Sequence, residues 1–162
     1  MEFTTVIIVT MAKQNKFNLK GAEKKARKAL ENAVVEVGNT AKNFFVENFR
    51  KQGFDDKTVQ RWKPRKRTTY KTKSGRIVND TTRAILVKTG DLRRSIIRVP
   101  NRSALNVKIQ TDLIYAKVHN DGLRAGRGKG FKMPKRQFIG DSYNLNEKVK
   151  AVIVKRLDKV FT

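Results

Sequence analysis

The sequence predicts an α+β fold, in which a long N-terminal amphipathic helix and a C-terminal helix pack on a small antiparallel β-sheet with long basic loops. Three observations support this prediction. Apolar residues recur at three- and four-residue steps over 21–51 and again over 143–161, which is typical of helices that bury one face. Between these segments, Leu105, Val107 and Ile109 alternate with polar residues, as they do in a half-buried strand.

The length of 162 residues fits one domain, and we expect an N-terminal extension over 1–20 followed by a single domain over 21–162. The opening stretch, MEFTTVIIVT, has too few contiguous apolar residues for a secretory signal. It indicates either a short strand or a start codon placed upstream of a true start at Met11. No apolar run approaches the length of about 18 residues that a membrane-spanning helix needs.

The first helix is predicted from Gly21 to Lys51, where Gly38 either bends it or allows close packing and Gly53 marks its end. Its apolar stripe consists of Ala26, Leu30, Val34, Val37, Ala41, Phe44, Phe45 and Phe49. The aromatic part of this region allows two interpretations, a simple core or a surface that is covered on assembly, and burial tendencies favour the core. The residues concerned are Phe44, Phe45, Phe49 and Phe54.

The middle of the chain reads as a long loop followed by short strands. Residues 53–83 carry several turn signals, and loops of this length are usually either functional or disordered. Strand-like runs follow at 84–88 and 95–99, and PNRSA at 100–104 reads as a hairpin loop that leads into the alternating strand at 105–109.

The last third of the chain contains a tight turn, a second loop and the closing helix. Residues 113–118 form a short helix or strand that leads into Asn-Asp-Gly, a sequence that favours positive φ at Gly122. Residues 122–136 form a loop rich in glycine and basic residues. Asp141 or Ser142 could cap the closing helix. One face of that helix carries Val149, Val152, Ile153, Leu157, Val160 and Phe161.

The charge of the chain is strongly positive, +24, from 38 basic and 14 acidic residues. Residues 61–76 hold eight basic residues and residues 124–136 hold six, and neither stretch contains an acid. Such a field attracts nucleic acid, anionic membranes or acidic protein surfaces. The residues expected to contact a polyanion or an acidic partner are Arg61, Lys63, Arg65, Lys66, Arg67, Lys71, Lys73, Arg76, Arg124, Arg127, Lys129, Lys132 and Lys135.

Catalytic chemistry has little support in the sequence. The chain has no cysteine and one histidine, His119, whereas a metal site needs several such ligands, so we expect no enzyme, no metal and no cofactor. GLRAGRGKG fails as a phosphate-binding loop because Gly130, rather than a hydroxyl residue, follows Lys129. His119 is expected to serve a turn, with its ring bonded to the backbone. The acids that a nuclease could gather are Asp80, Asp91, Asp112 and Asp121, but no spacing brings them together.

Four motifs follow one another along the chain: Trp62 in RWKP, LVKTGDLRRSI at 86–96, YAKVHNDG at 115–122 and MPKRQFIGDS at 133–142. Their order and spacing over about 20–160 resemble the tailed-phage virion morphogenesis family of tail-completion and neck proteins. Each motif alone is weak, whereas four in the right order are fairly specific. The positions that carry the resemblance are Trp62, Thr89, Gly90, Leu92, Ser95, Tyr115, His119, Gly122, Pro134, Arg136 and Phe138.

The chemistry of the second motif fits a turn. Gly90 supplies backbone freedom, and the side chain of Thr89 or Asp91 is expected to cap the turn that follows. Leu92 and Ile96 are spaced to pack inward.

The fourth motif is expected to be structural. Pro134 and Arg136 lead into Phe138, which we expect to anchor the segment in the core. The resemblance implies that Arg136 bonds carbonyl groups near the YAKVHNDG turn, and it carries over no catalytic residue.

The resemblance implies a structural virion protein that forms a homo-oligomeric ring at the head–tail junction and is assembled in the host cytoplasm. The implied partners are portal, adaptor or head-closure proteins and the tail tube or tail terminator, with non-specific contact to packaged DNA and no membrane. The alternative is a non-specific nucleic-acid-binding protein on which Trp62, Tyr70 and Phe131 stack bases. Acidic partners are favoured over DNA for the basic loops, because a tight grip would impede DNA passage.

Overall fold

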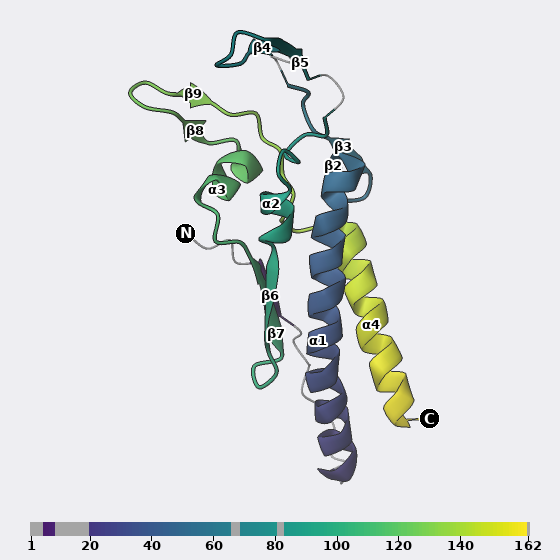
Figure 1. Cartoon of the computed structure of the whole chain (residues 1–162). Helices are drawn as coiled ribbons and strands as arrows, with labels where there is room; N and C mark the ends of the chain where they lie inside the picture. Colours follow the sequence, from purple (N-terminus) through teal and green to yellow (C-terminus); the bar gives the residue numbers. More distant parts are fainter. Residues whose placement is uncertain (1–4, 9–19, 66–68, 81–82, 162) are drawn as a thin grey trace.

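A computed structural model describes residues 5–8, 20–65, 69–80 and 83–161. Two helices, α1 (Lys20–Lys51) and α4 (Tyr143–Phe161), lie side by side and run in opposite directions (Figure 1). A small antiparallel sheet covers another side of α1. The predicted α+β architecture is therefore confirmed.

The sheet has the strand order β1–β7–β6, with β1 at Thr5–Ile8, β7 at Asn106–Gln110 and β6 at Ile97–Asn101. The opening stretch thus contributes a short strand, which pairs with β7. Val107 and Ile109 of β7 are buried, as their alternation predicted. On the other face of the sheet, Ile97 and Val99 of β6 are 46% and 44% exposed.

Close contact between α1 and this sheet depends on Gly38. A Cβ atom at this position would lie 2.9 Å from Cγ2 of Val107 and 3.1 Å from Cδ of Arg98. Of the two roles predicted for this glycine, close packing is therefore confirmed.

The C-terminal end of α1 lies two residues before the predicted glycine. Gln52 takes the left-handed conformation with φ 53°, and Gly53 already begins strand β2 (Gly53–Asp55). A Cβ at Gly53 would lie 2.6 Å from the carbonyl oxygen of Gln60 in β3 (Val59–Arg61), so the glycine is needed for strand approach.

The phenylalanines of the first helical region belong to the core. Phe45 and Phe49 are 0% and 1% exposed, and Phe44 and Phe54 are 5% and 4% exposed. Phe49 contacts the ring of Phe138 with centroids 5.2 Å apart. The core interpretation is confirmed, and the suggestion that these rings wait for an assembly partner is wrong.

The region 53–83 is not a single loop. It contains the hairpin β2–β3 and a second hairpin of β4 (Thr69–Lys71) and β5 (Ile77–Asn79). Strands of three residues are too short to show a period of two, so the sequence pattern missed them.

The predicted strand at 84–88 is wrong. This segment turns, with the amide of Val87 donating to the carbonyl of Ala84 at 3.4 Å and Leu86 at φ 60°. Ile85, Leu86 and Val87 pack against the core as single side chains, which explains an apolar run without strand pairing.

Strand β6 begins and ends two residues later than predicted, and it contains Pro100. Proline has no amide to donate, and it is tolerated here because β6 lies at the edge of the sheet. The hairpin turn consequently shifts to 102–105, where Leu105 takes φ 50° and is not part of a strand.

The segment after the sheet is a helix, α3 (Ile114–Asp121), that ends at Gly122 with φ 71°. Both the element and the left-handed glycine were predicted. The basic loop that follows contains a further hairpin, of β8 (Arg124–Ala125) and β9 (Phe131–Lys132).

The closing helix buries its predicted face most fully near its beginning. Val149 is 5% exposed, Val152 and Ile153 pack against the core, and Leu157 and Val160 are half-buried. The side chain of Phe161 lies outside the described residues.

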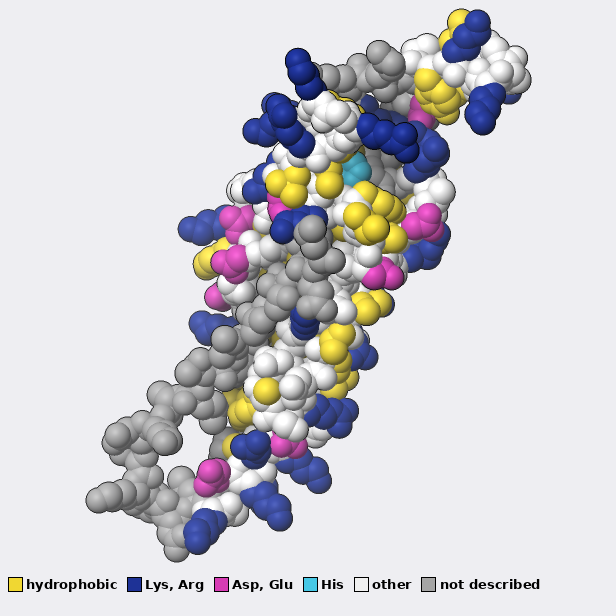
Figure 2. Space-filling model, turned by 90° about the vertical axis from the view of Figure 1, so that its left-hand side faces the viewer, with side chains coloured by type: hydrophobic (Ala, Val, Ile, Leu, Met, Phe, Trp, Pro, Cys, Tyr) yellow, Lys and Arg dark blue, Asp and Glu magenta, His cyan; other side chains and the backbone are white. Residues whose placement is uncertain are grey.

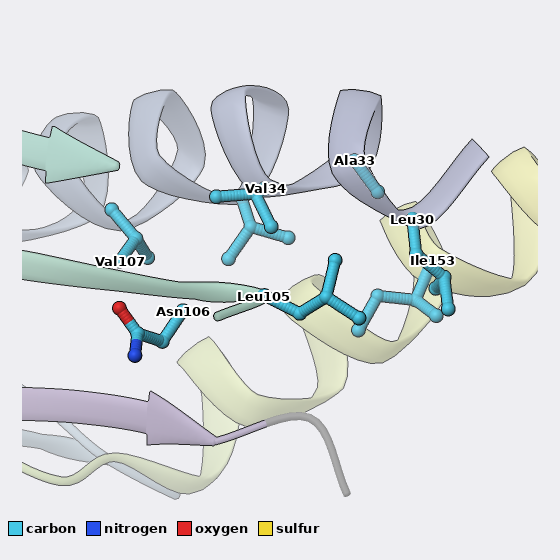
Figure 3. A pocket seen from close by; sticks show the side chains of 8 residues that line it. Leu30, Ala33, Val34, Leu105, Asn106, Val107 and Ile153 are labelled. Atoms are coloured by element: carbon cyan, nitrogen blue, oxygen red, sulfur yellow. The ribbon is translucent and has the colours of Figure 1, made fainter. Parts of the chain in front are cut away.

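A small cavity lies between α1, α4 and the start of β7 (Figure 3). It measures about 10 Å³, and Leu30, Val34, Leu105 and Ile153 are among the side chains that line it. A gap of this size has room for one water at most, and Asn106 is its one polar lining side chain, so we regard it as a packing defect.

Candidate functional site: the motif cluster and the basic hairpins

Trp62 is the buried residue of the first motif, and it lies at a contact between distant segments. The indole Nε1–H of Trp62 donates to the carbonyl oxygen of Gln137 at 2.7 Å, and the backbone amide of Trp62 donates to Gln52 at 2.9 Å. The indole packs edge-to-face on Phe49 with centroids 5.6 Å apart and is 6% exposed. Trp62 is therefore unable to stack on a base, and that part of the nucleic-acid hypothesis is wrong.

Arg136 joins the first, third and fourth motifs. Its Nε donates to the carbonyl of Lys63 at 3.1 Å and its Nη2 to that of Pro64 at 3.4 Å, while its backbone amide donates to the carbonyl of His119 at 2.8 Å. The guanidinium was expected to bond carbonyls near YAKVHNDG, and instead it reaches RWKP. Burial, and then the charge of Arg65, lower the pKa of Arg136.

Two buried asparagines hold the fourth motif in place. The Oδ1 atom of Asn120 accepts from the backbone amides of Phe138 and Ile139 at 2.9 and 3.0 Å. Asn48, on α1, donates from Nδ2 to the carbonyl of Phe138 at 3.1 Å and accepts from the amide of Asp55 at 3.1 Å. Sequence reasoning missed both residues, although a polar residue on the apolar face of α1 was a usable signal for Asn48.

Ser142 caps the closing helix. Its Oγ accepts from the amide of Leu145 at 3.2 Å and donates to the carbonyl of Asp55 at 2.7 Å. Of the two predicted caps, Ser142 is the one observed. Burial opposes ionisation of the Asp55 carboxyl, but hydrogen bonds from Lys51 and Asn144 outweigh it and lower its pKa.

The second motif forms the short helix α2 (Asp91–Arg94) without a side-chain cap. Gly90 precedes it with φ 82°, while the hydroxyl of Thr89 and Nη2 of Arg94 both donate to the Asp91 carboxylate. The prediction that Thr89 or Asp91 caps the turn is wrong, because the two side chains bond each other.

Leu92 and Ile96 of the second motif face inward, whereas Lys88 and Arg93 are exposed. Leu92 and Ile96 are 3% and 0% exposed, as their spacing predicted. Ser95 donates to the carbonyl of Leu92 at 2.9 Å and shares a hydrogen bond of 2.6 Å with Thr111 of the segment after β7.

His119 has no hydrogen-bond partner for its buried Nδ1 atom among the described residues. The ring was expected to bond the backbone, and Nδ1 makes no such bond. The ring packs edge-to-face on Tyr115 with centroids 6.1 Å apart. Burial, and then the nearby charge of Arg136, lower the pKa of His119. Tyr115 is 44% exposed, and burial followed by the charge of Asp91 raises its pKa.

The aspartates that a nuclease could use are not gathered. Asp80 pairs with Arg65 at 3.1 Å and with Arg83 at 2.5 Å. Within the described ranges, no three or more His, Asp or Glu side chains come together in a way that could hold a metal ion. No helix in the described part of the chain is long and apolar enough to cross a bilayer.

Two basic hairpins, β4–β5 and β8–β9, lie at the end of the molecule where α1 ends (Figure 1). Lys and Arg side chains surround this end (Figure 2), and Tyr70, Ile77 and Phe131 are 47%, 70% and 60% exposed. Lys66 and Arg67 lie outside the described residues, and Arg65 is half-buried. The other predicted contact residues are exposed: Arg61, Lys63, Lys71, Lys73, Arg76, Arg124, Arg127, Lys129, Lys132 and Lys135.

The side chains of Trp62, Asn120 and Arg136 bind backbone groups of other motif segments, so the sequence signature maintains the fold. The chain matches the profile of the phage virion morphogenesis family over residues 13–158, and it belongs to that family. It is thus a phage virion morphogenesis protein, of a structural rather than a catalytic family. No curated protein and no solved structure shows significant similarity to it.

Proposed function

We propose that this protein is a ring subunit at the head–tail junction of the virion, where it joins the tail to the DNA-filled head as a neck or tail-completion protein. The chain belongs to a virion morphogenesis family. The observation that carries this proposal is that one face of its sheet exposes apolar side chains on a strand at the sheet's edge. Ile97 and Val99 are about half exposed on the face away from α1, and their strand, β6, lies at the edge of the sheet.

An exposed edge strand with apolar side chains is a natural site for pairing with another chain. Rings arise when one surface of a subunit binds a different surface of the next and the rotation closes. Strand addition along β6 would supply backbone hydrogen bonds, with none donated by the nitrogen of Pro100, and burial of Ile97 and Val99 would add the hydrophobic contribution.

The basic hairpins supply the second contact in this proposal. A ring repeats each hairpin once per subunit, so their charges combine into a positive collar. Portal, adaptor or head-closure proteins on one side and the tail tube or tail terminator on the other are the proposed acidic partners. Packaged DNA could contact the same collar through its phosphates without any reading of sequence.

The test is mass photometry of the purified chain over a range of concentrations, alone and with phage heads or tails that lack this protein. We expect a discrete ring-sized species, or a monomer that adds to heads or tails. Val99→Asp should abolish either behaviour, whereas Val154→Asp, at a position 48% exposed on α4, should not. A chain that stays monomeric and ignores virion parts would refute the proposal.

Non-specific nucleic-acid binding is the second candidate, and the exposed rings of Tyr70 and Phe131 beside the hairpin lysines favour it. Stacking on each ring would contribute about 1–3 kcal/mol. Affinity for duplex and single-stranded DNA, measured across salt concentrations, tests this idea. Tight binding that falls steeply with salt and weakens in a Tyr70→Ala variant, in a chain without affinity for virion parts, would favour this candidate over the ring.

A further inference from the structure

A surface hollow of about 360 Å³ lies between the 83–92 segment, helix α3, Arg65 and Arg136. Arg65, Arg83 and Arg136 line it together with Tyr115 and His119. The motif contacts described above hold the surrounding segments in place. None of them fills the hollow itself.

The hollow carries more positive charge than its own acids balance. Arg65 and Arg83 share one carboxylate, that of Asp80, at 3.1 and 2.5 Å. Arg136 is 6% exposed and directs two of its N–H groups at backbone carbonyls rather than at a carboxylate. A guanidinium has five N–H donors, so donors remain available for an added anion.

The positive side chains around the hollow lie close enough to affect one another's pKa. The charge of Arg65 contributes to the lowered pKa of Arg136, and the charge of Arg136 contributes to the lowered pKa of His119. The Asp91 carboxylate, at another wall, is already bonded by Thr89 and Arg94. A bound anion would relieve the repulsion between the guanidinium groups of Arg65 and Arg136.

The other walls combine apolar side chains with a few polar ones, among them Lys88, Thr89 and Tyr115. Ile85, Leu86 and Val87 line one side, and the buried Nδ1 atom of His119 has no partner among the described residues. Hydrophobic side chains are also exposed on the face drawn in Figure 2, which includes the histidine. A ligand that suits this hollow therefore combines an anionic group with an apolar body.

We propose that this hollow binds a carboxylate side chain presented by an acidic segment of another virion protein. A planar guanidinium fork matches a carboxylate in two-point contact, and the apolar wall would receive the neighbouring side chain of the same segment. The naming of a virion protein rests on the proposed function, whereas the carboxylate chemistry rests on the hollow alone.

The experiment measures binding of a rhodamine-labelled peptide, Ala-Leu-Glu-Glu-Leu-Ala, to the full chain by fluorescence anisotropy. A peptide with glutamine in place of both glutamates is the matched control ligand. Arg83→Gln and Lys88→Gln change the hollow without touching buried Arg136, and Lys150→Gln, at an exposed position on α4 outside the hollow and both basic hairpins, is the matched control variant. Circular dichroism melting checks that each variant is folded.

We expect the glutamate peptide to bind at least about tenfold more tightly than the glutamine peptide, and Arg83→Gln to weaken it about tenfold, as for the loss of one charge-assisted hydrogen bond. Lys150→Gln should change affinity less than about twofold. Equal binding of the two peptides, or equal weakening by Arg83→Gln and Lys150→Gln, would overturn the proposal.

Two further readings separate the alternatives. If inorganic phosphate displaces the peptide at a concentration close to the Kd of the peptide, the hollow is a free-phosphate site and the proposal fails. If Arg83→Gln disrupts self-association in mass photometry, the occupant is a second copy of this chain and the assignment to another protein fails. If the chain forms rings but does not bind the peptide, only the proposed carboxylate site fails. If it binds the peptide but forms no rings and ignores virion parts, only the proposed ring function fails.

Discussion

Replacing Asn120 with alanine should destabilise the protein more than replacing an exposed asparagine with alanine. The reason is that the side-chain oxygen of Asn120 accepts hydrogen bonds from two buried donors. Oδ1 of Asn120 lies 2.9 and 3.0 Å from the amides of Phe138 and Ile139. Asn120 is 7% exposed, and the two donor residues are 0% and 3% exposed, so water has little access to the freed N–H groups.

The expected loss follows from the two unsatisfied donors. Each buried donor left without a partner costs about 1–3 kcal/mol, so the Asn120→Ala variant should lose about 2–6 kcal/mol of unfolding free energy. Domains are typically stable by about 5–15 kcal/mol, which makes this a large fraction of the total.

Urea unfolding followed by tryptophan fluorescence is a direct assay, since Trp62 is the single tryptophan and bonds Gln137, next to Phe138. Asn101→Ala is the control: its Oδ1 accepts from the amide of Ala104 at 3.0 Å in an exposed turn, and the loss should stay near 0.5 kcal/mol. A loss below about 1 kcal/mol for Asn120→Ala would refute the argument that these two bonds hold the fourth motif.

Three further predictions concern the other motifs. Gly122→Ala should destabilise the fold by about 2–4 kcal/mol in urea unfolding, because a Cβ at φ 71° would lie 2.8 Å from the amide nitrogen of Lys135. Trp62→Phe should lower stability by about 1 kcal/mol in thermal unfolding, because the carbonyl of Gln137 loses its donor. His119 has a pKa lowered below 6.5 in the folded chain, so stability should fall as pH decreases from 6.5 to that lower pKa, where the unfolded chain binds a proton that the folded chain does not.

Each of these predictions has a matched control. Gly128→Ala introduces a Cβ at φ 61° with no atom within 4 Å, so a loss as large as that of Gly122→Ala would show that contact with the next motif is irrelevant. Tyr70→Phe, on an exposed ring, should change stability by less than about 0.5 kcal/mol, and an effect equal to Trp62→Phe would contradict the hydrogen-bond argument. His119→Gln should flatten the stability profile below pH 6.5, and an unchanged slope would assign the effect to other groups.

Periodicity predicted the long elements well. Alternation and three- to four-residue spacing locate α1, α4 and the buried face of β7, because each buries a continuous apolar surface. The same criterion failed at 84–88, where an apolar run packs as separate side chains in a turn, and over 53–83, where the strands are three residues long.

The motif series predicted the family and the residues that matter for folding, but not what those residues contact. Arg136 was expected near YAKVHNDG and reaches Lys63 and Pro64, because a long side chain can span to any segment that the fold brings near. Trp62 was considered as a base-stacking ring and is buried on Phe49.

The sequence by itself determined the α+β class, the positive charge, the helix faces and the family signature, since these depend on residue type and on spacing along the chain. Only the tertiary structure decided that Asn48 and Asn120 support one segment from two helices, and that three arginines from separate segments line one hollow. Such arrangements depend on which distant residues meet in space, and local spacing carries no record of that.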